Sequence, residues 1–530
     1  MSNAKFGMVG LGTMGRNFLL NVADSGFSCV GFDIDAEKRR LLIDEGKEWN
    51  VAAAETLADM VAKLESPRSI MLLVPAGTIV DAVIADLIPL LDEGDLLIDG
   101  GNSHYVDTER REALLAEKGL GYLGVGVSGG EEGARLGPSI MPSGKREYYD
   151  RVAPIFESVA AKVNGEPCVA YMGTGSAGHF VKMVHNGIEY GLMQILAETY
   201  DLMLRVLKMD YSEMAETFAR WNNSDLNSYL VEITADVLDK VDADTGRPLV
   251  EVVLDKAAQK GTGKWTSQAA MDLGVPIPTI DSAVSMRQIS AQKETRVEIA
   301  ELLGHGLEAG SERRSAGGEV VTSKPEDTPK AAREKAATET VASVSIEGSQ
   351  SDHSDAKASQ PPQDQDAGVR SAFESHRAQS LRQLENTLIS SFIVTYAQGM
   401  SMLQIASKER GYGLSLPDIA KIWRGGCIIR SALLERIRSA YLEDPDLPNL
   451  IMASEFSEML AENSGDWHTI IGEFSKSRVP SLCLSSGLSY FEAFRSARLP
   501  ANLIQAQRDY FGAHTYQRTD REGTFHTEDW

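Results

Sequence analysis

The feature that most constrains the fold is a glycine-rich turn placed directly after the first apolar run of the chain. Phe6–Val9 has the composition of a short buried strand, and residues 10–15 then read GLGTMG before a helical pattern begins. In such a G-x-G-x-x-G spacing the first glycine permits a tight turn, the second lets backbone approach a pyrophosphate, and the third lets helix and strand pack closely. Free N–H groups at the helix start bind phosphate oxygens. We therefore predict a dinucleotide site at Gly10, Leu11, Gly12, Thr13, Met14 and Gly15.

The same strand, turn and helix pattern repeats through residues 1–176. Short apolar runs at Cys29–Phe32, Ile70–Val74, Leu96–Ile98 and Tyr122–Val125 are typical of further strands, and helical patterns lie between them. Alternation of this kind favours an α/β domain with a parallel, doubly wound sheet.

After Gly178 the chain changes to long helical periodicities with few β-branched runs. Phe180–Leu207, Ile280–Leu303 and Arg377–Glu409 are examples, and they predict a mostly α-helical second region. Residues 305–376 interrupt it with Ser, Ala, Glu, Asp, Gln, Gly and Pro. Such a segment buries too little apolar surface to offset an ordering entropy of about 1–2 kcal/mol per residue. It is predicted to be a disordered insert, serving either as a tolerated surface insertion or as a docking arm for a partner.

Net charge and cysteine spacing exclude several classes of binding partner and site. The chain has 52 Lys+Arg against 76 Asp+Glu, a net charge of −24, so nucleic acid and anionic membranes are unfavourable partners. No apolar run reaches the length of about 18 residues that a membrane helix needs, and no signal-peptide layout is present. Cys29, Cys168, Cys427 and Cys483 lie far apart without a C-x-x-C, which suggests neither disulfides nor a metal site. We predict a cytoplasmic protein that binds no metal.

One helical segment concentrates the polar residues that could perform chemistry. Lys182, His185, Asn186, Glu189 and Tyr190 fall at i, i+3, i+4, i+7 and i+8, on one face of a helix whose other positions are apolar. A buried polar stripe is costly unless it faces a ligand or pairs internally, so a satisfied internal network is the alternative. A lysine desolvated in a cleft can act as a general base, and a carboxylate two turns away can act as a separate acid.

Several longer strings resemble those of the 6-phosphogluconate dehydrogenases, the decarboxylating members of the 3-hydroxyacid dehydrogenase superfamily. The matching strings are LIDGGNSHY (97–105), GVGVSGGEEGAR (124–135), GHFVKMVHNGIEYG (178–191), QKGTGKWT (259–266), WRGGCIIRS (423–431) and LPANLIQAQRDYFGAHTY (499–516). They run in order along almost the whole chain outside the insert. The resemblance implies a Rossmann domain, a large all-α domain and a homodimer in which a C-terminal tail reaches into the partner subunit.

The domain boundaries follow from the changes in composition and periodicity along the chain, together with this resemblance. The predicted domains are residues 1–176 (Rossmann), 177–304 (first half of the all-helical domain), 305–376 (insert), 377–500 (second half) and 501–530 (tail).

The resemblance also implies a reaction, which belongs to the pentose phosphate pathway. Lys182 would take the proton of the C3 hydroxyl of 6-phosphogluconate while hydride passes to a nicotinamide cofactor. The 3-keto acid would lose CO2, and Glu189 would protonate C1 to give ribulose 5-phosphate. No metal is required.

The same resemblance implies the binding residues. The residues that would hold the sugar acid are Asn102, Ser128, Gly129, Gly130, His185 and Asn186. The phosphate would be bound by Tyr190, Lys260, Thr262 and Arg287, with Arg508 and His514 of the other subunit. Further cofactor contacts would come from Val74, Ala76 and Asn102.

The end of the second strand bears on the choice of cofactor. Asp33, Ile34 and Asp35 stand where NADP-using members of the family typically have an Asn-Arg-Thr pattern that grips the 2′-phosphate. An aspartate there accepts hydrogen bonds from ribose hydroxyls and repels a phosphate. Pro75 also replaces a frequent lysine, whereas the basic run at 38–40 could compensate. We predict that NAD is preferred, with NADP as the alternative.

Two other functions remain open. A 3-hydroxyacid dehydrogenase that does not decarboxylate would share the glycine loop and the lysine, but such enzymes lack the second helical half and the tail carrying Arg508. A non-catalytic dinucleotide sensor would share the fold, but the intact Lys182, Asn186 and Glu189 argue against it.

Overall fold

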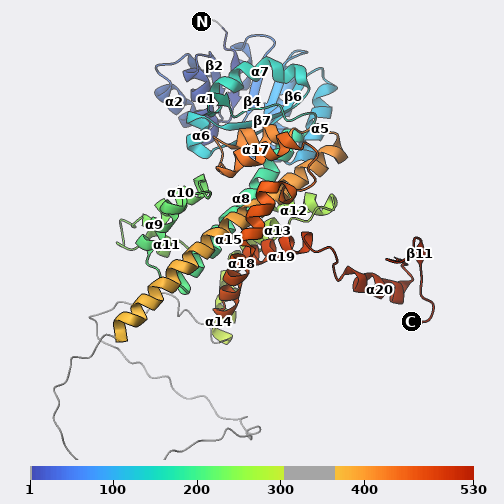
Figure 1. The fold of residues 1–530 in the computed structure, drawn as a ribbon. Coiled ribbons are helices and arrows are strands. Elements are labelled where there is room, and N and C mark those ends of the chain that lie inside the picture. The colour runs from blue at the N-terminus through green and yellow to red at the C-terminus, as the bar shows by residue number, and fades with distance from the viewer. Residues whose placement is uncertain (1–2, 304–364) are drawn as a thin grey trace, which may run out of the picture. The chain divides into compact units, whose positions relative to one another are not determined.

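The structure is a computed structural model that describes residues 3–303 and 365–530 (Figure 1). The chain divides into two compact units, one of Met1–Lys293 with Gln379–Trp530, and a smaller one of Glu294–Ala378. The larger unit holds every residue of the predicted site.

Within the described residues, a seven-stranded sheet of order β3-β2-β1-β4-β5-β6-β7 forms the N-terminal domain. The strands are β1 (Phe6–Val9), β2 (Cys29–Phe32), β3 (Val51–Ala53), β4 (Ser69–Leu72), β5 (Leu96–Asp99), β6 (Gly121–Ser128) and β7 (Ser139–Gly144). Strands β1 to β6 pair in parallel, and the strand order reverses between β1 and β4. Ligands of such sheets bind at this switch point, beyond the carboxyl ends of the strands.

The predicted α/β Rossmann domain, followed by a large helical domain and a tail, is confirmed. One part of the prediction is wrong, because β7 pairs antiparallel to β6. Strand β7 contains Pro142 and ends in Gly144, residues that weaken a strand pattern and are tolerated at a sheet edge. Strand β3 was not predicted, since three residues are too few to show alternation.

Helices cover both faces of the sheet. They are α1 (Thr13–Asp24), α2 (Ala36–Glu45), α3 (Leu57–Ala62), α4 (Thr78–Leu87), α5 (Tyr105–Ala116), α6 (Gly130–Leu136) and α7 (Arg146–Val159). Successive strand residues enter opposite cores: Leu96 and Ile98 of β5 pack in one and Leu97 in the other. This explains the continuous apolar runs, because a sheet covered on both faces has no solvent-facing side.

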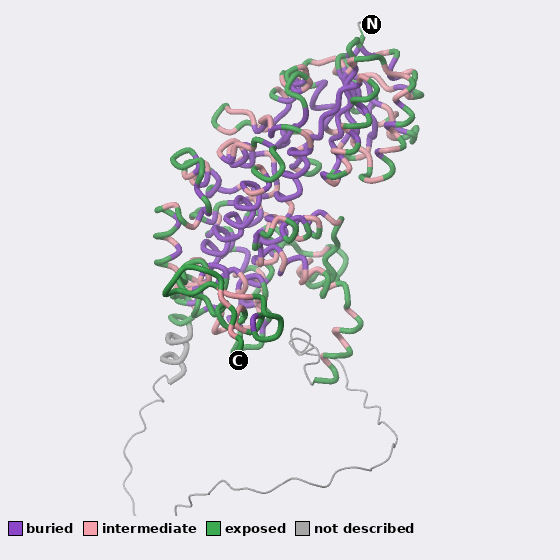
Figure 2. The backbone as a smooth tube through the Cα atoms, turned by 90° about the vertical axis from the view of Figure 1, so that its right-hand side faces the viewer, coloured by how far each residue is buried: buried purple, intermediate pink, exposed green. Residues whose placement is uncertain are grey.

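Two long helices form the centre of the helical domain, namely α8 (Ala177–Arg205) and α15 (Gln365–Arg410). A Cβ on Gly399 of α15 would lie 2.5 Å from Ile188 of α8, so the glycine allows the two helices to approach closely. Buried backbone is concentrated in the sheet and in these central helices (Figure 2).

The rest of the described chain after α8 adds further helices. They are α9 (Tyr211–Trp221), α10 (Tyr229–Asp239), α11 (Leu249–Val252), α12 (Thr262–Asp272), α13 (Pro278–Ala291), α14 (Lys293–Leu302), α16 (Leu416–Trp423), α17 (Leu433–Glu443), α18 (Ser454–Lys476), α19 (Leu482–Phe494) and α20 (Ala501–Gly512). Short strands β10 (Tyr516–Gln517) and β11 (Thr524–Phe525) pair as a hairpin in the tail.

Helix α15 begins earlier than predicted. Most of the predicted insert, residues 305–364, lies outside the described residues, but residues 365–376 are helical rather than disordered. Their sequence, QDAGVRSAFESH, contains few strong helix formers, and the helix reaches them because a helix extends readily from an existing turn. The segment Glu374–Arg410 is long and apolar enough to cross a membrane, yet 89% of its apolar window is buried inside the protein, as in a core helix.

Candidate active site

The glycine loop between β1 and α1 has the shape that a pyrophosphate requires. Gly10 has φ +95°, and a Cβ there would lie 2.5 Å from the carbonyl oxygen of Leu73. A Cβ on Gly15 would lie 1.9 Å from the carbonyl oxygen of Gly10, whereas a Cβ on Gly12 would meet nothing within 4 Å. Gly12 is also the N-cap of α1 and offers no capping side chain. The open space above free N–H groups therefore fits a dinucleotide phosphate.

Asp33 closes this loop from the end of β2. Its carboxylate accepts hydrogen bonds from the backbone N–H of Leu11 at 2.8 Å and of Asp35 at 2.9 Å. Lys38 approaches the same carboxylate at 3.5 Å, and Asp33 is only 7% exposed. The neighbouring Ile34 is 92% exposed. Asp33 therefore shapes the loop in addition to any role toward a ribose.

The other predicted cofactor residues lie on the loops after β4 and β5. A Cβ on Gly10 would lie 2.9 Å from Cγ1 of Val74, and the carbonyl oxygen of Val74 lies 3.4 Å from where a Cβ on Gly101 would be. Ala76 and Asn102 are exposed on the same two loops. The carboxyl ends of β1, β4 and β5 thus bring these residues together at the switch point of the sheet.

A buried arginine, which the sequence analysis did not identify, ties those two loops together. Arg111 of α5 is 0% exposed and donates to Asp99 at 3.1 Å, to Ser103 at 3.0 Å and to the carbonyl oxygen of Gly77 at 2.9 Å. Its Nε donates to Asp81 at 2.8 Å. The sequence pattern places Arg111 on the face of α5 that is buried, and a buried charged residue needs polar partners.

Three residues of the polar stripe of α8, Lys182, His185 and Asn186, are connected by hydrogen bonds, and Glu189 lies 3.9 Å from His185. Lys182 Nζ donates to Asn186 Oδ1 at 2.8 Å, and Asn186 Nδ2 donates to Thr262 Oγ1 at 3.0 Å. The two ring nitrogens of His185 lie 3.2 Å from Asn186 Oδ1 and 3.3 Å from Ser128 Oγ. Strand β6, helix α8 and helix α12 therefore meet at Lys182.

Glycines let α8 lie directly on the sheet. A Cβ on Gly126 of β6 would lie 2.5 Å from Cβ of Lys182, and one on Gly178 would lie 2.1 Å from the carbonyl oxygen of Met141. The turn at Gly129 and Gly130, with φ +121° and +63°, leads into α6, and a Cβ on Gly129 would lie 2.7 Å from the carbonyl oxygen of Gly426. Of the predicted substrate residues of the Rossmann domain, Ser128 is placed beside His185 of the helical domain.

Burial shifts the pKa values of Lys182, Glu189 and His185. It lowers the pKa of Lys182 below its usual value, against the opposing effect of the Glu189 carboxylate. It raises the pKa of Glu189, against the cations Lys182 and Arg287. Burial also holds the pKa of His185 well below its usual value, with Lys182 acting in the same direction. A lysine that loses its proton more easily and a carboxyl that keeps its proton longer are suited to act as base and acid.

The predicted phosphate residues gather beside the end of this stripe. The guanidinium carbon of Arg287 lies 3.5 Å from the ring centroid of Tyr190. The start of α12 packs on the same ring, since a Cβ on Gly263 would lie 2.5 Å from it. Thr262 opens that helix, and Lys260 is exposed two residues earlier. Arg508 and His514 lie on the tail, where they contact tail residues, as described below.

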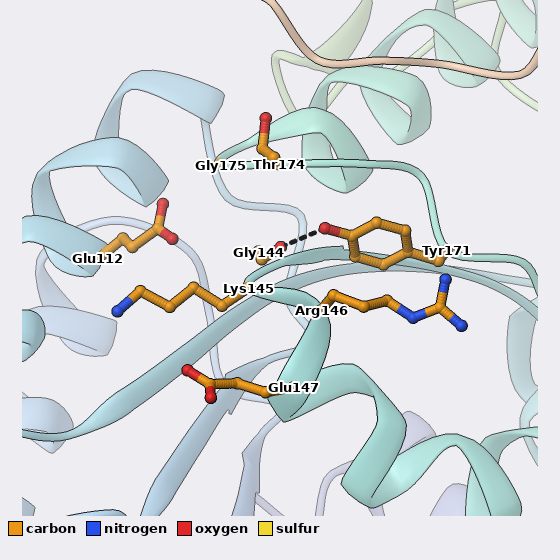
Figure 3. A pocket seen from close by; sticks show the side chains of 8 residues that line it. All are labelled: Glu112, Gly144, Lys145, Arg146, Glu147, Tyr171, Thr174 and Gly175. Carbon is orange, nitrogen blue, oxygen red and sulfur yellow. Dashed lines mark hydrogen bonds between the residues drawn. The ribbon is translucent and has the colours of Figure 1, made fainter.

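A separate hollow of about 350 Å³ lies at the start of α7 (Figure 3). It is lined by Glu112, Gly144, Lys145, Arg146, Glu147, Tyr171, Thr174 and Gly175. Arg146 pairs with Asp150 at 2.7 Å, and the Tyr171 hydroxyl donates to Gly144 at 2.5 Å. Its charges balance, and it includes none of the predicted site residues.

In the described part of the chain, no group of three or more His, Cys, Asp or Glu side chains is arranged to hold a metal ion.

Both domains match family models of 6-phosphogluconate dehydrogenase. Residues 5–173 match the family described as the NAD binding domain of 6-phosphogluconate dehydrogenase. Residues 178–328 and 328–530 match the family described as the 6-phosphogluconate dehydrogenase C-terminal domain.

Individual relatives match along the whole chain. The NADP(+)-dependent, decarboxylating 6-phosphogluconate dehydrogenase of Bacillus subtilis is 44% identical, covering 100% of this chain and 99% of the relative. The decarboxylating enzyme of Escherichia coli is 41% identical over the same shares. A solved 6-phosphogluconate dehydrogenase of Plasmodium falciparum is 37% identical, with a TM-score of 0.83, covering 99% of this chain and 100% of that one. The chain therefore belongs to the 6-phosphogluconate dehydrogenase family.

Proposed function

We propose that the protein converts 6-phosphogluconate to ribulose 5-phosphate and CO2 while a nicotinamide cofactor accepts hydride. The observation that carries this proposal is the buried network of Lys182, Asn186 and His185 beside the cofactor end of the sheet, in a chain that matches its relatives from end to end. The direct test is an assay of cofactor reduction with 6-phosphogluconate, using NAD and NADP separately.

Lys182 serves first as a base and then as an acid. Its neutral amine takes the proton of the C3 hydroxyl, which leaves C3 as a ketone once its hydride has been transferred. The resulting ammonium donates a hydrogen bond to the C3 oxygen. When the bond between C2 and the carboxylate carbon C1 breaks, its electron pair forms a double bond between C2 and C3, and the ammonium stabilises the negative charge that develops on the C3 oxygen. Asn186, which accepts from Nζ, orients the lysine throughout.

Glu189 completes the reaction after CO2 has left. Its carboxyl delivers a proton to the carbon that becomes C1 of ribulose 5-phosphate, and the enolate thereby becomes the ketone while Lys182 keeps its proton. Burial favours the protonated form that this step needs. His185 is held neutral, so its ring can hydrogen-bond substrate hydroxyls without adding charge.

Glu189→Gln should separate the two proton transfers. Because the Glu189 carboxylate raises the pKa of Lys182, its removal should lower that pKa. The rate of hydride transfer falls at low pH because it requires neutral Lys182, and in the variant this fall should move to lower pH. Formation of the final product should become slower, because the proton donor to carbon is missing. Single-turnover absorbance of the reduced cofactor across pH measures this shift, and Glu232→Gln on α10 serves as a control. A shift of this fall to higher pH would contradict the assigned pair.

A nicotinamide cofactor is supported by the family, and we propose that this chain prefers NAD. The basic run that could bind a 2′-phosphate is engaged with its neighbours. Arg39 donates to the carbonyl oxygen of Asp33 at 2.7 Å and to Glu55 at 3.0 Å. Arg40 pairs with Glu37 and Asp44, each at 2.5 Å. These acids pair with the two arginines of the run, while Lys38 approaches Asp33 itself, and the Asp33 carboxylate at the end of β2 is the group that selects the ribose hydroxyls.

We further propose a homodimer with shared active sites. The tail exposes apolar side chains, with Leu503 61%, Ile504 60% and Phe511 71% exposed, and such a surface is typical of an interface. Arg508 and His514 on the same tail would complete the phosphate site of a second copy of the chain.

Subunit mixing tests this arrangement. Arg508→Ala and Lys182→Met parents should each be nearly inactive, but mixed dimers should recover activity because one of their two sites contains both intact residues. Charge-assisted contacts to a phosphate contribute about 1.5–3 kcal/mol each, so the parental loss is large enough to measure. The absence of recovery after verified subunit exchange would show that each site is built from one chain.

All four cysteines are buried and unpaired, which accords with the cytoplasmic location that we propose.

A further inference from the structure

We propose that Asp509 is a positioning residue that holds Arg508 and His514 as a preformed clamp for the substrate phosphate. This inference rests on the proposed function, which assigns the phosphate to those two residues. Asp509 touches neither substrate nor cofactor and would act through its neighbours in the chain.

The C-terminal tail folds around this one carboxylate. Among residues 501–530, Asp509 is the one buried residue, with 0% exposure. Its Oδ1 accepts from the backbone N–H of Thr515 at 2.9 Å and from Nδ1 of His526 at 2.9 Å. Its Oδ2 accepts from the N–H of Thr527 at 3.0 Å and from Nε1 of Trp530 at 3.2 Å. The hydrogen bonds of this buried carboxylate therefore join α20 to the last residues of the chain.

The backbone around His514 needs such an anchor. Ala513 and Thr515, on either side of it, have φ +48° and +63°, in the left-handed region that residues with a Cβ disfavour. Backbone strain of this kind persists only where surrounding contacts impose it. The bond from Thr515 N–H to Asp509 supplies that constraint. A Cβ on Gly512 would lie 2.7 Å from Nε2 of His514, so the glycine leaves room for the ring.

Arg508 is joined to the same centre through Gln505. Arg508 Nη1 donates to Gln505 Oε1 at 3.0 Å, and Gln505 Nε2 donates to the carbonyl oxygen of Thr515 at 2.5 Å. Thr515 thus connects Arg508 and the backbone beside His514 to Asp509. Holding a long side chain before binding reduces the conformational entropy that binding must remove, so the network should strengthen phosphate binding without touching the phosphate.

Asp509 keeps its charge in this setting. Burial acts to raise its pKa, but the hydrogen bonds from Thr527, His526 and Thr515 outweigh burial and hold the pKa below its usual value. An ionised carboxylate accepts from all its donors at once, which a neutral carboxyl does less well.

The first test compares Asp509→Ala with Asp520→Ala in the full-length enzyme. Asp520 is an exposed carboxylate of the same tail that pairs with Arg518. For Asp509→Ala we expect the KM for 6-phosphogluconate to rise about tenfold or more, the size of one lost charge-assisted contact. The KM for the cofactor should stay within about twofold. Asp509→Asn, which keeps one acceptor oxygen, should fall between these values. An unchanged KM for 6-phosphogluconate, or an equal rise for both ligands, would overturn the proposal.

A double-mutant cycle separates positioning from a merely structural role. In a background that already carries Arg508→Ala and His514→Ala, Asp509→Ala should change the Kd for 6-phosphogluconate, measured by equilibrium binding, by less than about twofold, because its effect passes through those side chains. An additive loss in that background would show that Asp509 acts by another route.

Amide hydrogen exchange distinguishes this proposal from the proposed function. The N–H groups of Thr515 and Thr527 should exchange slowly in the wild type and rapidly in Asp509→Ala, whether or not the enzyme turns over 6-phosphogluconate. A wild type that fails to oxidise 6-phosphogluconate overturns the proposed function. Unprotected Thr515 and Thr527 in an active wild type overturn the clamp alone.

Discussion

Lys182→Met is expected to abolish turnover while leaving cofactor binding intact. Loss of a general base costs about 100- to 10,000-fold, and here the same residue also serves as the acid that stabilises the enolate. Lys182 donates to Asn186 of its own helix, whereas Gly10, Gly15 and Asp33 shape the glycine loop, so the dinucleotide site should remain formed. Steady-state absorbance of the reduced cofactor measures turnover, and fluorescence titration measures cofactor affinity.

Lys264→Met provides the matched control for this change. Lys264 is an exposed lysine on α12, close in sequence to Thr262, and it is not part of the polar network described here. It should retain activity within about twofold of the wild type, as most surface substitutions do. Activity of Lys182→Met within about tenfold of the wild type would rule out its role as the base.

NAD should be used with a catalytic efficiency at least about tenfold greater than that of NADP, a difference of about 1.4 kcal/mol. Asp33→Asn together with Ile34→Arg should move the preference toward NADP, because the change removes a repelling carboxylate and adds a guanidinium. Ile34 is 92% exposed, so an arginine needs no repacking there. Asparagine keeps an oxygen that can accept the Leu11 N–H and so preserves the glycine loop.

The control for charge is Asp33→Asn with Ile34→Gln, which lengthens the side chain without adding a cation. It should weaken the preference for NAD but not improve use of NADP to the same degree. Equal or better use of NADP by the wild type would show that the run at Lys38, Arg39 and Arg40 overrides Asp33.

Sequence patterns within a few residues of one another predicted the glycine loop and the polar face of α8. The glycine loop was visible because its spacing is local in the sequence, with Gly10 and Gly15 at positions where a Cβ would clash with backbone and Gly12 at the open start of α1. The stripe from Lys182 to Tyr190 was visible because helical spacing alone places its members on one face. Strand β7 was missed, since Pro142 hides the pattern and its pairing with β6 is a tertiary choice.

Residues that act through distant partners could not be predicted in this way. Arg111 looks like a surface charge until the structure shows its bonds to Asp99 and Gly77. Asp509 looks like one carboxylate in a polar tail until His526 and Trp530 are seen to bind it. In both cases the fold brings together groups between which the sequence shows no periodic relation.

The most direct measurement is the ratio of CO2 released to cofactor reduced when the wild type is supplied with 6-phosphogluconate. If Lys182 and Glu189 perform the oxidation, decarboxylation and final protonation in turn, we expect one CO2 for each reduced cofactor, with ribulose 5-phosphate as the product. Cofactor reduction without CO2 would identify a dehydrogenase that stops at the keto acid, and no reduction of either NAD or NADP would contradict the proposed catalysis itself.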